Sequence, residues 1–329
     1  MFDLGQLERA HDIVGAAMPP TPAYAWPLLS ERLGATAIVK HENHTPIGAF
    51  KVRGGLVYVD RLKRERPGVA GLISATRGNH GQSLAYAASR YRVPVTIYVP
   101  HGNSTEKNRA MRAFGANLVE HGEDFQAAHV EAERRAKLDG LEFVPSFHPD
   151  LVLGVATYAL ELLRKAPDLD VLYVPIGQGS GICGCILVRD LLGLATEIVG
   201  VQSTEAPFYA LSFAAGTIVT TESSNTLADG MTTRVPDADA LAIIRKGASR
   251  MVQVTDAEVA AAIRAYWTDT HNLAEGAGAA ALAAALQDKP KLRGRRVGLI
   301  LSGGNIDLDL FERWVMPQTV ASASGRVLV

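Results

Sequence analysis

Short apolar segments alternate with longer segments of helical spacing through the middle of the chain. The apolar segments cover residues 71–75, 94–100, 117–120 and 142–145, and the helical segments cover 83–90, 105–114 and 124–138. Strands separated by helices in this way pair in parallel, because a parallel partner requires a long crossover connection. The alternation therefore predicts an α/β fold in which open parallel sheets are flanked by helices.

The same alternation continues after residue 150 and is also present before residue 67. We expect further strands at 37–40, 169–175, 197–201, 250–254 and 296–301, with helices at 256–266 and 276–286. Pro67 and Gly68 interrupt the chain before the middle unit. We therefore predict two α/β domains: a large cofactor-binding domain formed by residues 1–66 and 150–329, and a small domain formed by residues 67–149.

The composition excludes several classes of protein. Of the 329 residues, 47% are hydrophobic and 20% are charged, and the net charge is −1, so nothing attracts nucleic acid or an anionic membrane. The longest apolar run, 277–286, is too short to span a bilayer, and the first residues lack a signal-peptide pattern. The only cysteines, Cys183 and Cys185, make neither a disulfide framework nor a full set of zinc ligands. We expect a cytoplasmic protein with no nucleic-acid or membrane partner.

Three polar or glycine-rich loops follow predicted strands. The segment 177–181, Gly-Gln-Gly-Ser-Gly, precedes a helix, so its N–H groups and the helix dipole can hold a phosphate. The segment 302–305, Ser-Gly-Gly-Asn, lets the backbone approach a flat ligand, and the segment 76–81, Thr-Arg-Gly-Asn-His-Gly, can bind a carboxylate. Each loop alone is common as a simple turn, but ligands of open parallel sheets bind at the carboxyl ends of the strands. We interpret the three loops as parts of one site.

Lys51 is the candidate nucleophile of that site. Pro46 and Gly48 break any helix upstream, and the apolar spacing from Phe50 onward predicts a helix that begins at the lysine. The positive end of a helix and burial beneath Phe50 both disfavour an ammonium, so we expect a partly neutral amine able to form an imine with an aldehyde cofactor. A lone lysine is more often a solvated surface residue, and only the three loops favour the chemical interpretation.

Taken in order, these motifs resemble those of the fold-type II pyridoxal-phosphate enzymes, specifically the serine/threonine dehydratase (threonine ammonia-lyase) and serine racemase family. The motifs are Phe-Lys51-x-Arg-Gly, Gly-Asn79-His80, the glycine-rich loop at 177–181 and Ser302-Gly-Gly-Asn, and the resemblance extends from about Pro22 to Asp307. It implies a two-domain fold like that of the tryptophan synthase β chain, bound pyridoxal 5'-phosphate, a small amino-acid substrate and a homodimer.

The resemblance also implies roles for individual residues. Lys51 is the Schiff-base lysine and the base for the α-proton, Asn79 binds the ring hydroxyl of the cofactor, and Ser302 binds its ring nitrogen. The other residues expected to bind the cofactor are Phe50, Gly177, Gln178, Gly179, Ser180, Gly181 and Glu275. The residues expected to surround the substrate carboxylate are Thr76, Asn79 and His80, with Arg77 beside them as a candidate for substrate recognition.

The expected reaction removes the α-proton, expels the β-hydroxyl as water and releases an unsaturated amine that hydrolyses to a 2-oxo acid and ammonia. A serine at the ring nitrogen does not enforce protonation there, which favours prompt elimination over transamination. We predict a lyase that deaminates a β-hydroxy-α-amino acid, by default L-threonine or L-serine. An amino-acid racemase, a β-replacement synthase and a 3-hydroxyaspartate dehydratase remain alternatives, whereas the intact Lys51 disfavours a non-catalytic amino-acid-binding protein.

The chain departs from the family pattern at several positions. Arg77 stands where the racemases have a serine that serves as second acid, which disfavours racemisation. Pointing inward, Arg77 could pair with an extra substrate carboxylate, as on 3-hydroxyaspartate, although a solvent-facing arginine is the simpler interpretation. Gln202 and Phe208 replace acidic cation ligands of the racemases, so we predict no bound Mg²⁺. Arg234, in the loop 221–236 that should line the pocket, is a second candidate for specificity.

Overall fold

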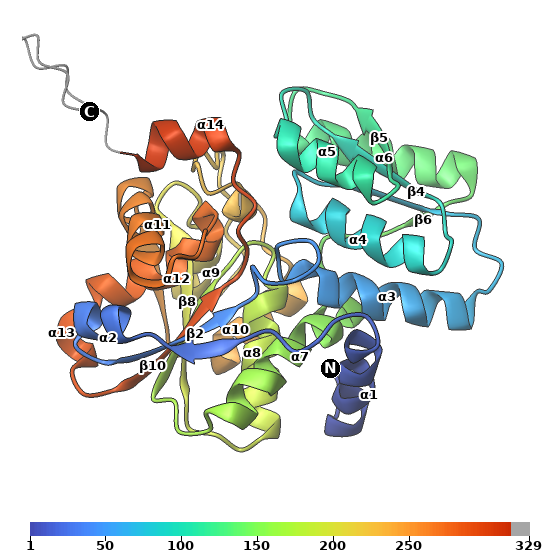
Figure 1. The fold of residues 1–329 in the computed structure, drawn as a ribbon. Coiled ribbons are helices and arrows are strands. Elements are labelled where there is room, and N and C mark those ends of the chain that lie inside the picture. The colour runs from blue at the N-terminus through green and yellow to red at the C-terminus, as the bar shows by residue number, and fades with distance from the viewer. Residues whose placement is uncertain (317–329) are drawn as a thin grey trace, which may run out of the picture.

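The computed structural model describes residues 1–316, which form two sheets side by side, each covered by helices (Figure 1). The larger sheet has six strands in the order β1-β2-β10-β7-β8-β9. In that order they are β1 (Ala23–Ala25), β2 (Thr36–His41), β10 (Arg296–Leu301), β7 (Val171–Pro175), β8 (Glu197–Ser203) and β9 (Arg250–Val254). Only β1 is antiparallel to its neighbour.

The smaller sheet has four parallel strands in the order β5-β4-β3-β6. They are β5 (Asn117–Glu120), β4 (Val95–Val99), β3 (Leu72–Ala75) and β6 (Glu142–Phe143), joined by α4 (Asn79–Arg90), α5 (Thr105–Ala113) and α6 (Phe125–Asp139). Helix α6 packs on the face that carries Ile73 and Ala75, and α4 and α5 pack on the opposite face. The predicted α/β class with parallel sheets between helices is confirmed.

Both faces of the larger sheet are covered, as its apolar strands require. Within β7, Val171 and Tyr173 face one layer, whereas Leu172 and Val174 face the other. The first layer contains α2 (Pro27–Leu33), α11 (Asp256–Thr270) and α12 (Gly276–Gln287), and the second contains α1 (Leu4–Gly15), α7 (Pro149–Lys165), α8 (Ser180–Leu191), α9 (Phe208–Ala215) and α10 (Ala238–Gly247). The remaining short elements are η1 (Asp229–Met231), α13 (Lys289–Leu292), α14 (Leu308–Leu310) and the π-helical η2 (Phe311–Val315).

Helix α3 (Lys51–Glu65) lies between the sheets and packs on both α4 and α7. A Cβ added to Gly54 would lie 2.9 Å from the Leu151 carbonyl oxygen, and one added to Gly55 would overlap Ser83, so glycines allow both close approaches. Helix α3 shares one apolar cluster with α1, α4 and β3. This cluster contains residues from both predicted domains, so it does not mark a boundary between them. The proposed division of the chain at residues 67 and 149 stays a prediction.

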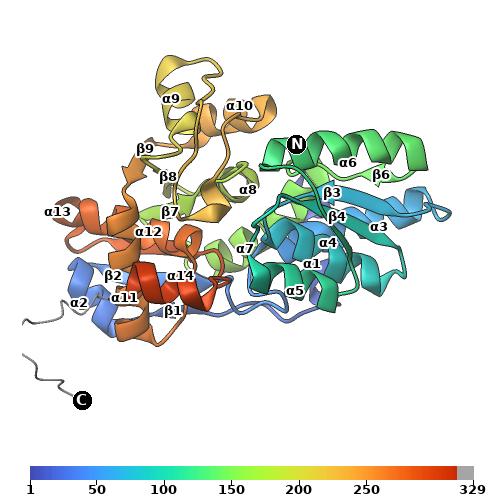
Figure 2. The ribbon, with the colours of Figure 1, turned by 90° about the horizontal axis from the view of Figure 1, so that it is seen from above.

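Four loops meet where the two sheets adjoin, because each follows the carboxyl end of a parallel strand. They begin after β2, β3, β7 and β10, and they are the lysine segment and the three loops that the sequence singled out. Viewed from above, the helices α4, α5 and α6 gather on one side of this junction and the helices α8 to α14 on the other (Figure 2). In residues 1–316, no helix combines the length and apolarity needed to cross a bilayer.

Candidate active site

Lys51 is the first residue of α3, as predicted, and its segment is joined to the loop after β10. The Phe50 N–H donates to the Ser302 carbonyl at 3.0 Å, and the Gly304 N–H donates to the Gly48 carbonyl at 2.9 Å. The Ser83 hydroxyl on α4 donates to the Lys51 carbonyl at 2.5 Å. The backbone of the lysine is therefore fixed from both sheets.

The Lys51 amine has the environment expected of a nucleophile. Its Nζ lies 5.5 Å from the centroid of the Phe50 ring and has no hydrogen-bond acceptor among residues 1–316. Burial lowers the pKa of Lys51 from 10.5 to about 8, because a low-dielectric pocket disfavours the ammonium. A sizeable fraction of the amine is consequently neutral near physiological pH.

The loop between β7 and α8 forms an anion cradle. None of the N–H groups of residues 177–181 has an acceptor in the described part of the chain. Gly179 has φ +100°, a conformation that favours glycine, and a Cβ on Gly177 would collide with the Gly230 carbonyl. The unpaired N–H groups stand at the start of a 12-residue helix, whose dipole adds to their attraction for an anion. Tyr209 fixes the loop by donating its hydroxyl hydrogen to the Gln178 carbonyl at 3.0 Å.

The loop after β3 continues into α4 earlier than the sequence suggested. The helix begins at Asn79 instead of residue 83. The polar residues from Asn79 onward, which were predicted to lie in a loop, form the first turn of the helix. The Gly78 N–H donates to Thr76 Oγ1 at 3.0 Å. Burial lowers the pKa of His80 to about 3, with a smaller contribution from Lys51, so the imidazole is neutral. Its buried Nε2 has no hydrogen-bond partner within residues 1–316.

Two buried polar residues complete the opposite wall. The side chain of Ser302, 4% exposed, lines the pocket at the end of β10. Glu275, 2% exposed, is the N-cap residue of α12 and accepts hydrogen bonds through both carboxylate oxygens. Burial raises the pKa of Glu275 to about 7, although Lys107 acts in the opposite direction.

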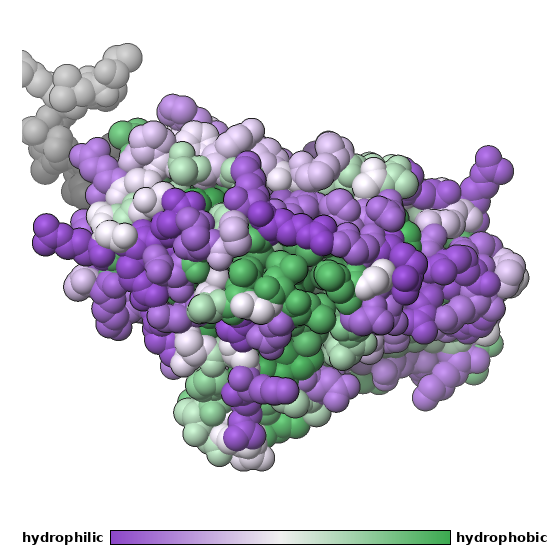
Figure 3. Space-filling view, turned by 90° about the horizontal axis from the view of Figure 1, so that it is seen from below, coloured by the Kyte–Doolittle hydropathy of each residue, from purple (hydrophilic) through white to green (hydrophobic). Residues whose placement is uncertain are grey.

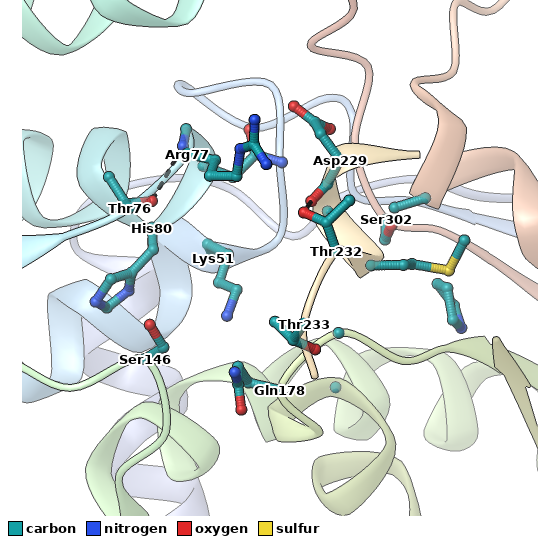
Figure 4. Close-up of a pocket in the computed structure, with 18 of the residues that line it drawn as sticks. Lys51, Thr76, Arg77, His80, Ser146, Gln178, Asp229, Thr232, Thr233 and Ser302 are labelled. Atoms are coloured by element: carbon teal, nitrogen blue, oxygen red, sulfur yellow. Dashed lines mark hydrogen bonds between the residues drawn. The ribbon is translucent and has the colours of Figure 1, made fainter. Parts of the chain in front are cut away.

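Every residue predicted for the site except the second specificity candidate, Arg234, lines one cavity of about 900 Å³ including its open mouth. In Figure 4 the Lys51 side chain points into the middle of this cavity, with Thr76 and His80 on one side and Ser302 on the other. Gln178 marks the end at the anion cradle, and Arg77 and Asp229 mark the opposite end. The arrangement places the Lys51 amine between the N–H groups of residues 177–181 and the polar loop at 76–80.

The two arginine candidates differ in position. Arg77 lines the cavity, is exposed, and makes no ion pair or hydrogen bond with another residue of 1–316. Arg234 is not among the lining residues and donates to the Glu222 carbonyl at 2.9 Å, so the structure does not bring it to the site.

The sequence did not single out several lining residues. They come from α5, the segment after β6, the start of α6 and the loop around η1, and they are Lys107, Phe125, Ser146, Met231, Thr232 and Thr233. The predicted lining role of the loop 221–236 was a signal for the last three. No motif marks Lys107, which reaches the site because its side chain extends from α5 to Asp229 and Glu275.

A buried lysine with a lowered pKa, unpaired N–H groups at a helix start and a buried hydroxyl, all at the ends of parallel strands, are the features expected of the fold-type II pyridoxal-phosphate enzymes. Residues 15–303 match the family described as "Pyridoxal-phosphate dependent enzyme", and the chain belongs to that family. The predicted family, fold class and cofactor are confirmed.

Two curated relatives and one solved structure are similar to most of this chain. The chain is 36% identical to the L-threonine ammonia-lyase of Geobacter sulfurreducens over 91% of this chain and 74% of the relative. It is 32% identical to the L-threo-3-hydroxyaspartate ammonia-lyase of Saccharomyces cerevisiae over 88% of each chain. The structure of maize serine racemase superposes with a TM-score of 0.89 at 26% identity, covering 94% of this chain and 96% of that one.

Proposed function

We propose that this protein is an ammonia-lyase that uses pyridoxal phosphate to convert a β-hydroxy-α-amino acid into a 2-oxo acid and ammonia. The observation that carries the proposal is the Lys51 amine, partly neutral and unpaired, between the cradle at 177–181 and the polar loop at 76–80. The names of the relatives agree with the predicted ammonia-lyase class.

The residues of the cavity fit the cofactor. The unpaired N–H groups at 177–181 suit its phosphate, the Phe50 ring suits a flat heterocycle, and Ser302 offers a neutral hydroxyl to a ring nitrogen. When bound, pyridoxal phosphate supplies an electron sink for the charge left at the α-carbon.

The protein supplies a base and a binding site for the substrate carboxylate. The Lys51 Nζ, with a pKa of about 8, accepts the α-proton. The Thr76 hydroxyl and the backbone N–H of Asn79 offer donors next to the start of α4, where the helix dipole favours a carboxylate. His80 stays neutral and can donate or accept a hydrogen bond through Nε2 without adding charge.

A second candidate is a substrate with an additional carboxylate, such as 3-hydroxyaspartate. Arg77 favours it, because the guanidinium lines the cavity with no protein carboxylate paired to it. Lys107 is not available to bind a second substrate carboxylate, because it already pairs with Asp229 and Glu275.

Release of 2-oxo acid and ammonia by the purified protein with added pyridoxal phosphate tests the proposal. The substrates are L-serine, L-threonine, L-threo-3-hydroxyaspartate and bulkier 3-hydroxy amino acids. Release from any of them supports elimination, and preference for 3-hydroxyaspartate supports the second candidate. A D-enantiomer accumulating without 2-oxo acid, or turnover only with a second nucleophile, would replace the proposal by a racemase or a β-replacement synthase.

The predicted homodimer is kept as part of the proposal. One face of the molecule carries an apolar area that extends from its middle towards the lower edge of the view, with polar side chains above it and to either side (Figure 3). Apolar areas bordered by polar residues are typical of protein interfaces. Sedimentation equilibrium should give a mass of twice 35.1 kDa, and a mass of 35.1 kDa at all concentrations would contradict the dimer.

A further inference from the structure

A chain of polar contacts behind Asn79 connects the two halves of the molecule. Asn79 Nδ2 donates to Glu275 Oε1 at 2.6 Å, and Asn79 Oδ1 accepts from Asn305 Nδ2 at 2.9 Å. On the other side of Glu275, Lys107 Nζ lies 3.4 Å from Oε2. Asn79 and Lys107 belong to α4 and α5, whereas Glu275 and Asn305 belong to the side of the larger sheet.

The contacts of Asn79 with Asn305 and with Glu275 impose the same orientation on its side-chain amide. The Ile47 carbonyl can only accept, so Asn305 directs its NH₂ group there, at 2.8 Å, and towards Asn79 Oδ1. A Glu275 carboxylate can also only accept, so it takes an N–H from Asn79. The second N–H of Asn79 has no acceptor within residues 1–316, and Asn79 lines the cavity.

Lys107 is placed to keep Glu275 an acceptor. The lysine is 5% exposed and pairs with Asp229 as well as Glu275, and Gly78 leaves the space that its aliphatic stem occupies. A buried carboxylate without a cation tends to bind a proton, and burial already raises the pKa of Glu275 to about 7. Without Lys107, a protonated Glu275 could donate to Asn79, and Asn305 alone would then oppose a rotation that turns the Asn79 oxygen to the cavity.

We propose that Lys107 is a positioning residue for the cofactor, which holds Glu275 as a hydrogen-bond acceptor so that Asn79 presents an N–H, and not its carbonyl oxygen, to the ring oxygen of pyridoxal phosphate. The inference rests on the proposed function only in that Asn79 faces the cofactor, and it does not depend on which amino acid is the substrate.

A double-mutant cycle on cofactor affinity tests this role. The variants are Lys107→Met, Glu275→Gln and the two combined, and the measurements are the Kd of the apoprotein for pyridoxal phosphate and the absorbance maximum of the bound cofactor. Each single change should weaken binding about tenfold and shift the maximum. The double variant should bind no more weakly than Glu275→Gln, because Lys107 acts through Glu275. Losses that simply add would overturn the proposal.

Two further variants separate positioning from a structural link between the sheets. Glu106→Ala removes another such link, the acceptor of the Leu308 N–H at 3.0 Å, and should lower the Tm while leaving cofactor affinity unchanged. Lys107→Arg keeps the charge and should retain affinity within about threefold. If Lys107→Met lowers only the Tm, as Glu106→Ala does, the proposal is wrong. Failure of the proposed function would look different, with cofactor bound normally by the wild type but no 2-oxo acid released.

Discussion

At the scale of single residues, the protonation state of Lys51 determines when it can react. Its pKa is about 8, and only the unprotonated amine attacks an aldehyde. The rate at which apoprotein takes up pyridoxal phosphate should therefore rise with pH and level off above about pH 8. With an ordinary lysine pKa of about 10.4, the rate would instead continue to rise up to about pH 10. Stopped-flow absorbance over a range from about pH 6 to about pH 10 measures this rate.

The cofactor itself titrates over the same range, so a small lysine analogue with a blocked α-amine is the matched control. Dividing the protein rate by the analogue rate removes the contribution of the cofactor, and the ratio should fall above about pH 8, because only the analogue amine is still losing protons there. A ratio that stays constant up to about pH 10 would contradict the depressed pKa of Lys51, and the Lys51→Ala variant should show no such reaction and no turnover.

Arg77 is the second residue whose role is open to a direct test. If its guanidinium pairs with a side-chain carboxylate of the substrate, Arg77→Gln should lower kcat/KM for 3-hydroxyaspartate about a hundredfold and change that for threonine less than about threefold. The matched control is Arg234→Gln, because Arg234 is also exposed but lies outside the cavity. Equal effects of Arg77→Gln on both substrates would show that the arginine only supports the loop.

At the scale of elements, the start of α3 is held by a buried ionic cluster. The guanidinium of Arg53, two residues after Lys51 and fully buried, donates to Glu42 on one side and to Glu161 of α7 on the other. Lys40 also pairs with Glu161, so the charges of the cluster balance. Because the contacts come from β2, its following residues and α7, the cluster fixes how α3 is oriented.

Arg53→Met should lower the free energy of unfolding by about 3–5 kcal/mol, since it leaves buried carboxylates without their main partner. The matched control is Arg61→Met on the same helix, where the arginine is 50% exposed and pairs with Glu65 and Asp150. Arg61→Met should lower the free energy of unfolding by less than about 1 kcal/mol. Chemical unfolding of both variants measures the difference, and equal losses would mean that the buried cluster contributes nothing beyond a surface ion pair.

Helix α9 explains why the segment after β8 should not need a cation. The buried Gln202 Oε1 accepts the N–H of Ala210 at 2.8 Å, and Phe208 begins the helix inside the apolar core. These side chains thus stabilise the start of α9 and offer no charged oxygen to a hard cation. Turnover should be unchanged after treatment with a chelator and dialysis, and activity that disappears and returns with added Mg²⁺ would show that the prediction is wrong.

At the scale of the whole molecule, the alternation of strands and helices was sufficient to predict the parallel sheets. The strands at 250–254 and 296–301 coincide with β9 and β10, because both are short segments rich in strand-forming apolar residues. Helices α9 and α10 were not predicted. Lys107, Asp229 and Glu275 carry no shared motif and are far apart in the chain, so their contact depends on how the sheets dock and could not be read from local patterns.

The cavity receives residues from both sheets, so bound cofactor should stabilise the molecule as a unit. A ligand at about 100 times its Kd contributes about 2.7 kcal/mol to the free energy of unfolding. An unfolding entropy of about 2.1 cal/mol/K per residue means that the Tm should rise by roughly 4 °C when apoprotein is saturated with pyridoxal phosphate. Calorimetry or fluorescence during heating measures the shift.

Pyridoxine phosphate separates the covalent and non-covalent parts of that shift, because it has the same ring and phosphate but no aldehyde. It can occupy the N–H cradle at 177–181 but cannot react with Lys51. The Tm should therefore rise less with pyridoxine phosphate than with pyridoxal phosphate, and Lys51→Ala should reduce the effect of the aldehyde to that of the alcohol. No shift with either compound would mean that the cradle does not bind the phosphate, whereas equal shifts in the wild type would mean that Lys51 adds nothing to binding.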